Sequence, residues 1–392
     1  MKNNQKVIFH IDMNAFFASC ELIKRPYLAD KPFAIGPRFT KKGVLSTANY
    51  VARKYGVSSA MNVSDALKKC PNLIIVEGDY HFYEECSNRF MKILSEYTPL
   101  ILQASIDEAF LDVTSLNRNP LELAKEIQNR ILNEAQLPSS IGIGPTLFLA
   151  KMGSDYKKPM GITLINKEDI KEKLYPLPIK DFFGIGLKSI PWFKERGINT
   201  IGDLAFNLEK IKNELSLIRY HDIYEKLNAT SSNTVDPERY SEQQSIGISR
   251  TATHNLETED EARDFLREIV KIVSKRAKYA HKEALTITLQ LRDPSFVTIN
   301  RSKTVRKATN DHLDIYDICV ELFEKNWILD PFNPIRLIGV SLSNLVDENR
   351  KEYDLFHLDN INEEEAIKDV IDNLNNKYQK NVISKGIIKK NK

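Results

Sequence analysis

The chain has 392 residues, of which 42% are hydrophobic and 28% charged, so it can bury a large core and form two to four domains. Its net charge of +3 is too small to indicate a nucleic-acid partner, and no stretch resembles a membrane span or a secretion signal. The four cysteines, Cys20, Cys70, Cys86 and Cys319, lack the spacing of a zinc site, which favours reduced thiols in a cytoplasmic protein.

The N-terminal part of the sequence predicts one mixed sheet. Apolar patterns predict a strand at 7–12, a helix at 81–97, two strands within 100–114, a helix at 121–134 and a strand at 139–144. This βαββαβ order is the ferredoxin-like unit, in which the first and third strands are antiparallel neighbours. The end of the first strand should therefore lie beside the start of the third.

Carboxylates occupy both of these strand ends. Asp12 ends the first apolar run, and Asp107 and Glu108 lie in the turn before the third strand. Three carboxylates at one sheet edge would repel one another unless a cation lay between them, and Mg²⁺ takes such positions with phosphate oxygens as further ligands. An Asp-Glu pair in a turn is more often solvated surface, but the position predicted for Asp12 favours a metal site.

The C-terminal part predicts a helical block at 167–230, a polar linker at 231–243 and a second βαββαβ unit. Thr258 and Glu261 form a capping box that marks the start of its first helix. We expect strands at 245–252, 284–292, 296–304 and 335–345, helices at 259–281 and 311–326, and a tail at 346–392.

Basic residues gather in the second βαββαβ unit. Between residues 241 and 345 there are fifteen Lys and Arg against fifteen Asp and Glu, so the unit is neutral overall. Its middle strands nevertheless carry a basic cluster that, with one arginine from each outer strand, could line one sheet face and bind a duplex backbone. Surface charge for solubility is the alternative. The residues are Arg250, Arg292, Arg301, Lys303, Arg306, Lys307 and Arg336.

Five stretches in a fixed order carry a resemblance to a known family. They are Asp12–Ala18, Ser46–Gly56, Ser105–Ala109, Gly142–Gly161 and Phe183–Gly186. Each stretch alone is a weak signal, but all five in this order and spacing are a strong one. On these motifs, residues 1–345 resemble a Y-family, lesion-bypass DNA polymerase of the bacterial DNA polymerase IV type.

The resemblance implies an α+β right-hand polymerase. Its ferredoxin-like palm would take 1–15 and 78–166, with small fingers inserted at 16–77, a helical thumb at 167–230 and a little finger, the second βαββαβ unit, at 244–345. The implied activity is template-directed DNA synthesis of low fidelity, by two-metal nucleotidyl transfer, in translesion synthesis and DNA repair. A two-metal nuclease or a non-catalytic DNA-binding scaffold are the alternatives.

The resemblance also implies the roles of the acidic residues. Asp12 and Asp107 would bridge two Mg²⁺ ions, Glu108 would complete the ion on the primer side, and the Met13 carbonyl would add a backbone ligand. Mn²⁺ can substitute for Mg²⁺. Asn14 stands where many family members have an acid, and we do not count it as a ligand.

Nucleotide-binding residues follow from the same motifs. Tyr50, Arg53 and Lys158 match the family's triphosphate ligands, and Arg suits the task because its planar fork can hold two phosphate oxygens. Backbone N–H groups near Ala15, Phe16 and Phe17 would add phosphate donors. Phe17 matches the steric gate, an aromatic ring that leaves no room for a ribose 2′-hydroxyl. A solvated helix face for Arg53 and a core position for Phe17 are the alternatives, and Phe16 is our candidate for the core position.

Contacts with DNA and with a clamp are predicted at three places. Gly184, Gly186 and Lys188 open a helix-hairpin-helix whose backbone amides can approach a DNA phosphate, and the basic cluster of the little finger would bind the duplex. Family members commonly end in a sliding-clamp peptide, for which Leu355 and Phe356 are the candidates. Glu352 stands where that peptide usually has Gln, and packing on the little finger is the alternative. The expected partners are primer-template DNA, dNTP and the clamp, with the protein a monomer.

Overall fold

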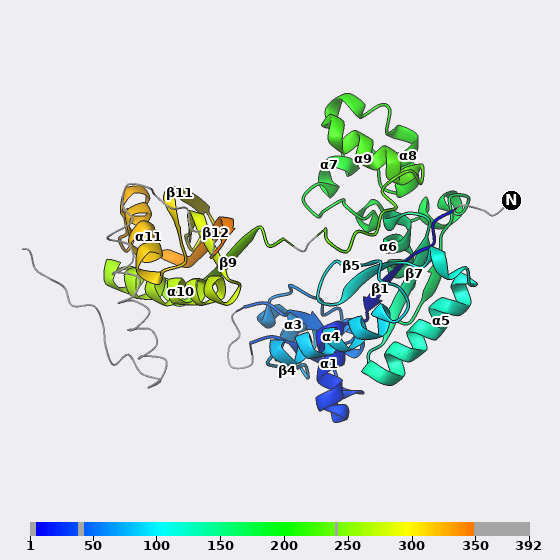
Figure 1. Ribbon diagram of the computed structural model, residues 1–392, viewed down its shortest axis with the longest axis horizontal. Coiled ribbons are helices and arrows are strands. Elements are labelled where there is room, and N and C mark those ends of the chain that lie inside the picture. The colour runs from blue at the N-terminus through cyan, green and yellow to red at the C-terminus, as the bar shows by residue number, and fades with distance from the viewer. Residues whose placement is uncertain (1–4, 38–42, 240–241, 349–392) are drawn as a thin grey trace, which may run out of the picture. The chain divides into compact units, whose positions relative to one another are not determined.

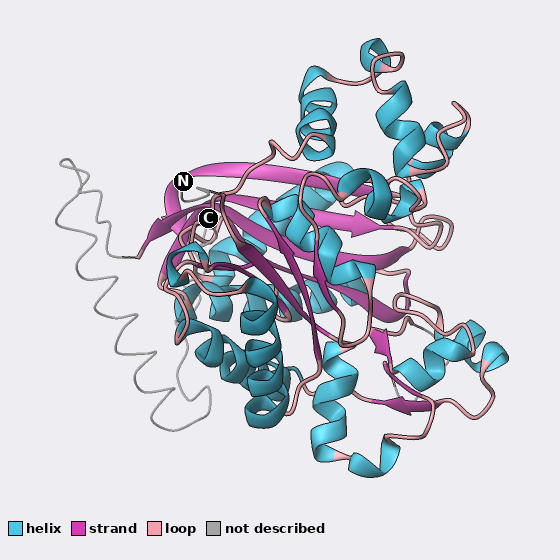
Figure 2. Cartoon of the chain, turned by 90° about the vertical axis from the view of Figure 1, so that its right-hand side faces the viewer, coloured by secondary structure: helices cyan, strands magenta, loops and turns pink. Residues whose placement is uncertain are grey.

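The computed structural model describes residues 5–37, 43–239 and 242–348. The chain divides into two compact units after Glu242 (Figure 1), and both units combine helices with strands (Figure 2). Within the described ranges, no helix has both the length and the apolar character needed to cross a bilayer. All four cysteines lie in these ranges and are buried and free.

A five-stranded sheet in the order β5-β6-β1-β7-β8 forms the centre of the first unit. The predicted pairing of the first and third strands is confirmed, because β1 and β6 are antiparallel neighbours. The fifth strand, β8, runs parallel to β7 and was missed, since its three residues are too few for a periodic pattern. The strands are β1 (Ile8–Met13), β5 (Ile101–Gln103), β6 (Glu108–Asp112), β7 (Ser139–Gly144) and β8 (Ile162–Leu164).

The two faces of this sheet are covered by different helices. Phe9, Ile11 and Met13 belong to the large core shared with α4 and α5. Because side chains alternate along a strand, His10 and Asp12 point to the opposite face, where α6 packs against β1 and β7. The helix predicted at 121–134 ends sooner as an α-helix and continues as a π-helical turn, Ile131–Ala135. The helices are α4 (Tyr80–Ser95), α5 (Pro120–Arg130) and α6 (Leu147–Tyr156).

A second, smaller sheet in the order β3-β2-β4 lies between β1 and α4 in the sequence. Helix α1 directly follows β1, and α2 begins at Asn49, whose side chain caps it by accepting a hydrogen bond from the Ala52 N–H at 2.9 Å. The elements are α1 (Phe16–Lys24), β2 (Phe33–Ile35), β3 (Thr47–Ala48), α2 (Tyr50–Lys54), α3 (Val63–Lys69) and β4 (Ile74–Val76).

A helical block with its own core completes the first unit. It consists of short helices and turns, namely a π-helical turn (Ile170–Leu174), 3₁₀ turns (Ile179–Asp181 and Lys212–Glu214), α7 (Ile190–Lys194), α8 (Ile201–Asn207) and α9 (Leu217–Leu227). The segment after it, predicted as a linker, is held on the first unit at its start, since Val235 is buried beside Ile8 and the Leu147 N–H donates to the Ser232 carbonyl at 3.0 Å.

The second unit has the predicted βαββαβ order of elements, in a sheet ordered β11-β10-β12-β9. Here the fourth strand lies between the first and second, whereas in the first unit the third strand does. The Thr258–Glu261 capping box is present at the start of α10. The elements are β9 (Ser245–Leu256), α10 (Glu259–Tyr279), β10 (Lys282–Arg292), β11 (Thr298–Thr309), α11 (His312–Asn326) and β12 (Ile335–Asp347).

The prediction that the basic cluster lines one face of this sheet is wrong. Arg301 and Lys303 lie opposite Leu289 and Ile287, on the side covered by helices, where Arg301 donates to Asn326 Oδ1 at 2.8 Å and Lys303 pairs with Glu321.

Other members of the cluster lie elsewhere. Arg250 is paired with the buried Ile338 and lies on the covered side at the edge strand. Arg336 belongs to β12, an inner strand rather than an outer one. Arg292 and Arg306 alternate with the core residues Leu291 and Val305 and point to the open face. The predicted cluster combined residues from odd and even positions of the same strands. Because successive side chains of a strand point to opposite faces, these residues cannot all line one face.

Candidate active site

The strand pairing brings the predicted acids together at one end of the first sheet. Asp12 lies opposite Glu108 in the β1–β6 register, and the Met13 N–H donates to the Asp107 carbonyl at 3.0 Å. Asp107 itself is in the turn between β5 and β6, where its carboxylate accepts a hydrogen bond from Ser105 Oγ at 2.6 Å. Asp12 is buried and Glu108 half-buried, so their charges require compensation.

Two lysines provide this compensation, Lys151 in the middle of α6 and Lys158 just beyond its C-terminal end. Lys151 Nζ lies 2.6 Å from Glu108 Oε1 and 3.2 Å from Asp12 Oδ2. Lys158 Nζ lies 2.7 Å from Asp12 Oδ1 and 2.8 Å from Asp155 Oδ1, and Asp155 also lies 3.4 Å from Lys151. Lys151 and Asp155 were not predicted as site residues. Their spacing of four residues places both side chains on one face of a helix, which indicates that they can act together.

Helix α6 approaches the sheet closely where Gly142 of β7 faces Gly153 of the helix, because neither residue has a side chain there. A Cβ on Gly142 of β7 would lie 1.9 Å from the Ala150 carbonyl oxygen, and a Cβ on Gly153 would lie 2.9 Å from the Gly142 Cα. Only glycine fits at this approach. The Gly-Ile-Gly stretch therefore sets the distance between Lys151 and the β1 carboxylate.

The site titrates as a coupled group. Burial raises the pKa of Asp12 to about 7, a hydrogen bond shared with Glu108 adds to the rise, and Lys158 and Lys151 oppose it. Burial would raise the pKa of Glu108 as well, but the neighbouring His10, whose Nε2 lies 3.6 Å away, together with Asp12 and the charge of Lys151, outweighs it, so that pKa is lowered. Burial also lowers the pKa of His10 to about 4, so this ring is neutral at pH 7.

A pocket of about 250 Å³ opens beside Asp12, and its walls come from β1, α1, the small sheet and the segment after α6. It brings together Asp12, Asp107 and Met13 with every residue predicted to bind the nucleotide, and it adds Ser46, Thr47 and Ser59, which were not predicted. Glu108 does not line this pocket. The lining residues are Asp12, Met13, Ala15, Phe16, Phe17, Ser46, Thr47, Tyr50, Arg53, Ser59, Asp107 and Lys158.

The wall of the pocket formed by α2 is cationic. Arg53 is fixed by a hydrogen bond from Nε to the Ala48 carbonyl at 2.9 Å, and its guanidinium lies 4.9 Å from the centre of the Tyr50 ring. The Tyr50 hydroxyl is buried and has no hydrogen-bond partner among the described residues. A buried polar group of this kind is costly unless it is paired, so the hydroxyl is suited to a ligand oxygen.

The two adjacent phenylalanines at the start of α1 have different environments. Phe16 is 3% exposed and packs edge-on against Phe90 in the core. Phe17 is half-buried and lines the pocket, with its ring stacked on Tyr83 at 4.6 Å and met edge-on by Tyr80 at 5.6 Å. The two tyrosines hold the Phe17 ring in a fixed orientation.

Asn14 connects the two sides of the pocket. Its Oδ1 accepts a hydrogen bond from the Met160 N–H at 2.8 Å, and its Nδ2 donates to Ser140 Oγ at 2.9 Å. The residue after it, Ala15, has a φ of 46°, so the chain turns sharply into α1. Asn14 therefore ties the β1–α1 turn to the segment that carries Lys158, a role that the sequence did not reveal.

The oxygen donors around Asp12 suit a hard divalent cation. Carboxylates of Asp12, Asp107 and Glu108 and the Met13 carbonyl are the ligand type that Mg²⁺ prefers. The described residues contain no group of three or more His, Cys, Asp or Glu side chains arranged around one point. The carboxylates of Asp12 and Glu108 instead face the two ammonium groups, so their rotamers must change before they can share an ion.

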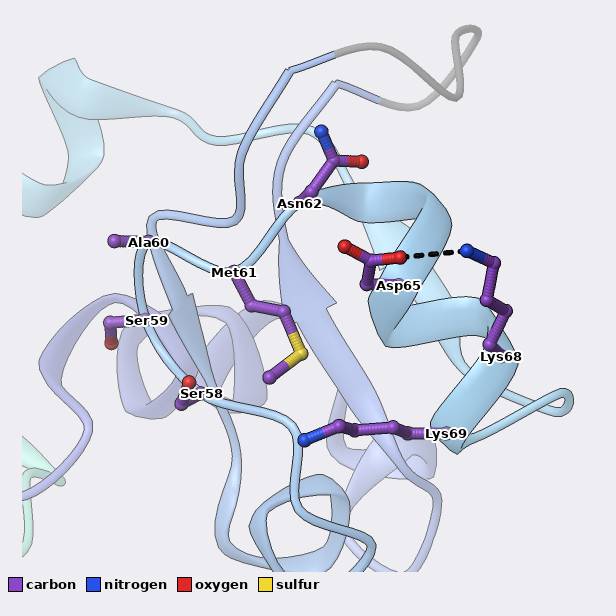
Figure 3. A pocket seen from close by; sticks show the side chains of 8 residues that line it. All are labelled: Ser58, Ser59, Ala60, Met61, Asn62, Asp65, Lys68 and Lys69. Atoms are coloured by element: carbon purple, nitrogen blue, oxygen red, sulfur yellow. Dashed lines mark hydrogen bonds and ion pairs between the residues drawn. The ribbon is translucent and has the colours of Figure 1, made fainter.

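A second hollow of about 570 Å³ lies in the small-sheet region, between the loop at 58–62 and α3 (Figure 3). Lys69 reaches across it to donate to the Gly56 carbonyl at 3.2 Å, and Asp65 pairs with Lys68 at 2.9 Å on its rim. Ser59 lines both this hollow and the pocket beside Asp12, so the loop at 58–62 is a wall of both.

The predicted glycine turn in the helical block is present. Gly184 has a φ of 104°, and Arg219 holds the turn by donating to its carbonyl at 2.8 Å. A Cβ on Gly186 would meet nothing within 4 Å, and Lys188 is exposed. The turn is therefore open to an approaching ligand.

Comparisons with known proteins agree with this architecture. The sequence model of the impB/mucB/samB family matches residues 11–155, and that of the family's C-terminal domain matches 243–355. The DNA polymerase IV of Bacillus velezensis is 38% identical, over 100% of this chain and 95% of the relative. The DNA polymerase IV of Clostridium kluyveri is 37% identical, over 99% of both.

The chain belongs to the DNA polymerase IV family. A solved Y-family DNA polymerase chimera of Dbh and Dpo4 has a TM-score of 0.77 at 26% identity, and the match covers 87% of this chain and 99% of that one. The predicted α+β right-hand polymerase and its lesion-bypass DNA polymerase activity are confirmed, and the nuclease and scaffold alternatives are not supported. As a family member the enzyme uses primer-template DNA, dNTP and a divalent metal.

Proposed function

We propose that the pocket beside Asp12 is where this DNA polymerase IV family member adds a dNTP to a primer 3′-end. One observation carries the proposal: a single pocket presents carboxylates on its β1 side and, on its α2 side, an arginine and a buried tyrosine hydroxyl without a partner. A metal-bound triphosphate in this pocket would lie between opposite charges, as nucleotidyl transfer requires.

The acidic residues would hold the metal. Asp12, Asp107, Glu108 and the Met13 carbonyl would hold two Mg²⁺ ions, for which Mn²⁺ can substitute. When bound, these ions neutralise the entering and leaving oxygens of the reaction. Lys151 and Lys158 stabilise Asp12 and Glu108 before loading, and Lys158, which lines the pocket, would then turn to a phosphate oxygen.

The nucleotide would be held by Tyr50, Arg53, Lys158 and the N-terminal N–H groups of α1 at Ala15, Phe16 and Phe17. Because Ala15 turns the chain sharply and carries no side-chain cap, these first amides of α1 are available. The Phe17 ring, fixed by Tyr80 and Tyr83, would exclude a ribose 2′-hydroxyl by its volume.

DNA would be bound at surfaces outside the pocket. The turn with Gly184, Gly186 and Lys188 would approach a backbone phosphate without reading sequence. In the second unit, the open-face arginines Arg292 and Arg306 are the stronger candidates, because Lys303 and Arg301 already have partners on α11. Arg250 and Arg336 remain in the proposed set.

We also propose that the enzyme is a monomer that docks on the sliding clamp through Leu355 and Phe356. Both residues lie outside the described part of the chain. A pull-down with the cognate clamp, comparing wild type with Leu355→Ala/Phe356→Ala, tests the docking. Unchanged clamp binding together with a lower melting temperature would instead assign both residues to packing.

Primer extension with Asp107→Ala tests the assignment of the pocket. We expect extension in Mg²⁺ to fall by orders of magnitude while the melting temperature stays near that of wild type, because the Asp107 side chain has one hydrogen-bond partner, Ser105, within the described part of the chain. Asp65→Ala is the matched control, since Asp65 is an exposed acid whose ion pair among the described residues is with Lys68. Near-normal extension by Asp107→Ala would refute the assignment.

A further inference from the structure

A groove of about 980 Å³ lies in the second unit between β9 and α10, and the catalytic proposal assigns it no role beyond Arg250. We call it the basic groove, because it is lined by Arg250 of β9 and by Lys271, Lys275 and Arg276 of α10. Among the residues that the structure describes, no acidic one lines it. The groove is thus a strongly cationic surface on a unit that is neutral overall.

The four cations of the basic groove have no carboxylate within 4.0 Å among the described residues. Arg276 donates instead to the Gly247 carbonyl at 2.9 Å. Some other cations of the same unit, among them Arg263, Lys282 and Lys303, are neutralised by ion pairs with carboxylates. The groove therefore concentrates uncompensated positive charge, which favours an acidic ligand.

Apolar surface lies between these charges. Ile246 and Ile272 line the groove, and Tyr279 is 89% exposed at its end. Charged phosphate groups gain nothing by covering apolar side chains, whereas a peptide that alternates acidic and apolar residues can pair with the cations and bury the apolar surface. The lining favours a peptide over a nucleic acid.

The chain itself passes this groove where the described part ends. Ser343 pairs with Ser245 at the start of β9, and the Glu348 N–H donates to the His281 carbonyl at 3.0 Å, immediately after Tyr279 and Ala280 of the groove. Residues 349–392 follow. Ten residues can span up to about 35 Å, so residues 349–358 are long enough to return the chain to the groove.

The sequence beyond this point contains a segment of matching chemistry, which we call the acidic segment, residues 359–372. It has six acids and one lysine, interleaved with Ile361, Ile367, Val370 and Ile371. The acids are Asp359, Glu363, Glu364, Glu365, Asp369 and Asp372.

We propose that the acidic segment docks in the basic groove of the same molecule. Its carboxylates neutralise the four groove cations, and its isoleucines and valine cover Ile246, Ile272 and Tyr279. A segment on a short tether acts at an effective concentration on the order of 1 mM, so a site with a Kd of about 100 µM would be occupied about ten to one. Weak intrinsic affinity is therefore sufficient, and the proposal does not depend on the catalytic assignment.

Hydrogen exchange on the full chain, at low and physiological salt, tests the docking. In wild type we expect the amides of 361–371 to exchange about tenfold more slowly than in Lys271→Glu/Lys275→Glu. Lys278→Glu/Lys307→Glu is the matched control, because it makes the same charge change at two exposed lysines outside the groove. Adding Glu363→Lys/Glu364→Lys to the groove variant should restore the slow exchange. A carbodiimide should also cross-link Lys271 or Lys275 to residues 363–365 in the monomer.

Three results would overturn the proposal. Equal exchange of 361–371 in wild type and the groove variant would show that the segment does not dock there. Protection that depends on protein concentration would place the segment in the groove of a second copy. A groove variant that weakens DNA binding, with exchange of 361–371 unchanged, would make the groove a nucleic-acid site.

Discussion

Replacing Lys151 by Met tests whether the two lysines act as internal counter-ions. The ammonium of Lys151 contacts both Glu108 and Asp12, at 2.6 and 3.2 Å, from a largely buried position. Methionine keeps much of the side-chain volume and removes the charge, so the two carboxylates would face each other with only Lys158 remaining beside Asp12.

The loss in free energy of unfolding that Lys151→Met causes can be bounded. Removing one member of a buried ion pair costs about 3–5 kcal/mol, and because Lys158 remains and the acids can share a proton, we expect about 3 kcal/mol at pH 8. For a unit of this size each kcal/mol lowers the melting temperature by about 2–4 °C, which gives a fall of roughly 6–12 °C.

The loss of stability in Lys151→Met should increase as the pH rises. The pKa of Asp12 is raised by burial to about 7 in the folded protein, above its ordinary value of 3.8. A raised carboxyl pKa contributes stability that is fully present below the unfolded value and is lost as the pH rises through the folded value. Removing the ammonium raises that pKa further, so the gap between Lys151→Met and wild type should be largest at pH 8. At pH 5 it should be smaller but should remain, because Glu108, whose pKa Lys151 helps to lower, is still ionised.

Thermal melts from pH 5 to 8, with and without Mg²⁺, measure these effects. Lys157→Met is the matched control, since Lys157 is the exposed neighbour of Lys158. Mg²⁺ should stabilise Lys151→Met more than wild type, because no ammonium competes with the ion. A variant that melts like wild type at pH 8 without Mg²⁺ would refute the counter-ion role.

Three further predictions concern the pocket and the DNA surface. In single-nucleotide extension, Phe17→Ala should raise the ratio of ribonucleotide to deoxynucleotide incorporation by roughly tenfold or more, a difference of about 1.4 kcal/mol. Phe16→Leu should leave the ratio unchanged, and the reverse outcome would move the gate to Phe16. Asn14→Ala removes the hydrogen bond to Met160 and should raise the KM for dNTP about tenfold with a smaller effect on kcat. Ser140→Ala, which keeps that hydrogen bond, is the control, and equal KM values for Asn14→Ala and wild type would refute a positioning role for Asn14. Arg306→Ala should reduce the slope of log K for DNA binding against log salt concentration by about one unit. Lys303→Ala should not, because Lys303 is already paired with Glu321. The opposite ranking would place DNA on the helix side of the sheet.

The sequence predicted the fold well where periodicity is long and regular. Strands of five or more residues and helices such as α4 and α10 have enough apolar repeats to define both type and position. The short β8 carried no such signal. The error in the basic cluster has a different cause, because charge counted along a strand ignores the alternation that sends Arg301 and Arg292 to opposite faces.

The acidic residues were predictable because strand order alone places Asp12 beside Glu108. The roles of Lys151 and Asn14 were not, since they depend on how closely α6 approaches the sheet and on a hydrogen bond to Met160, 146 residues away. The spacing of Lys151 and Asp155 shows that they share a helix face but not what they contact, and the contact between Asn14 and Met160 leaves no pattern in a single sequence. The pocket residues Ser46, Thr47 and Ser59 lie in or beside motifs that the resemblance covered, but nothing in their type marked them.

The balance of charge around Asp12 makes metal and nucleotide interdependent. Asp12, Asp107, Glu108 and Asp155 carry four negative charges when ionised, against the three positive charges of Lys151, Lys158 and Arg53 of the pocket wall. Two divalent ions alone would leave the pocket strongly positive, and a triphosphate alone would leave it strongly negative. Bound together they nearly cancel, so each should tighten the binding of the other by the same factor. In the proposed site, occupancy by free metal alone or by free nucleotide alone would therefore be disfavoured.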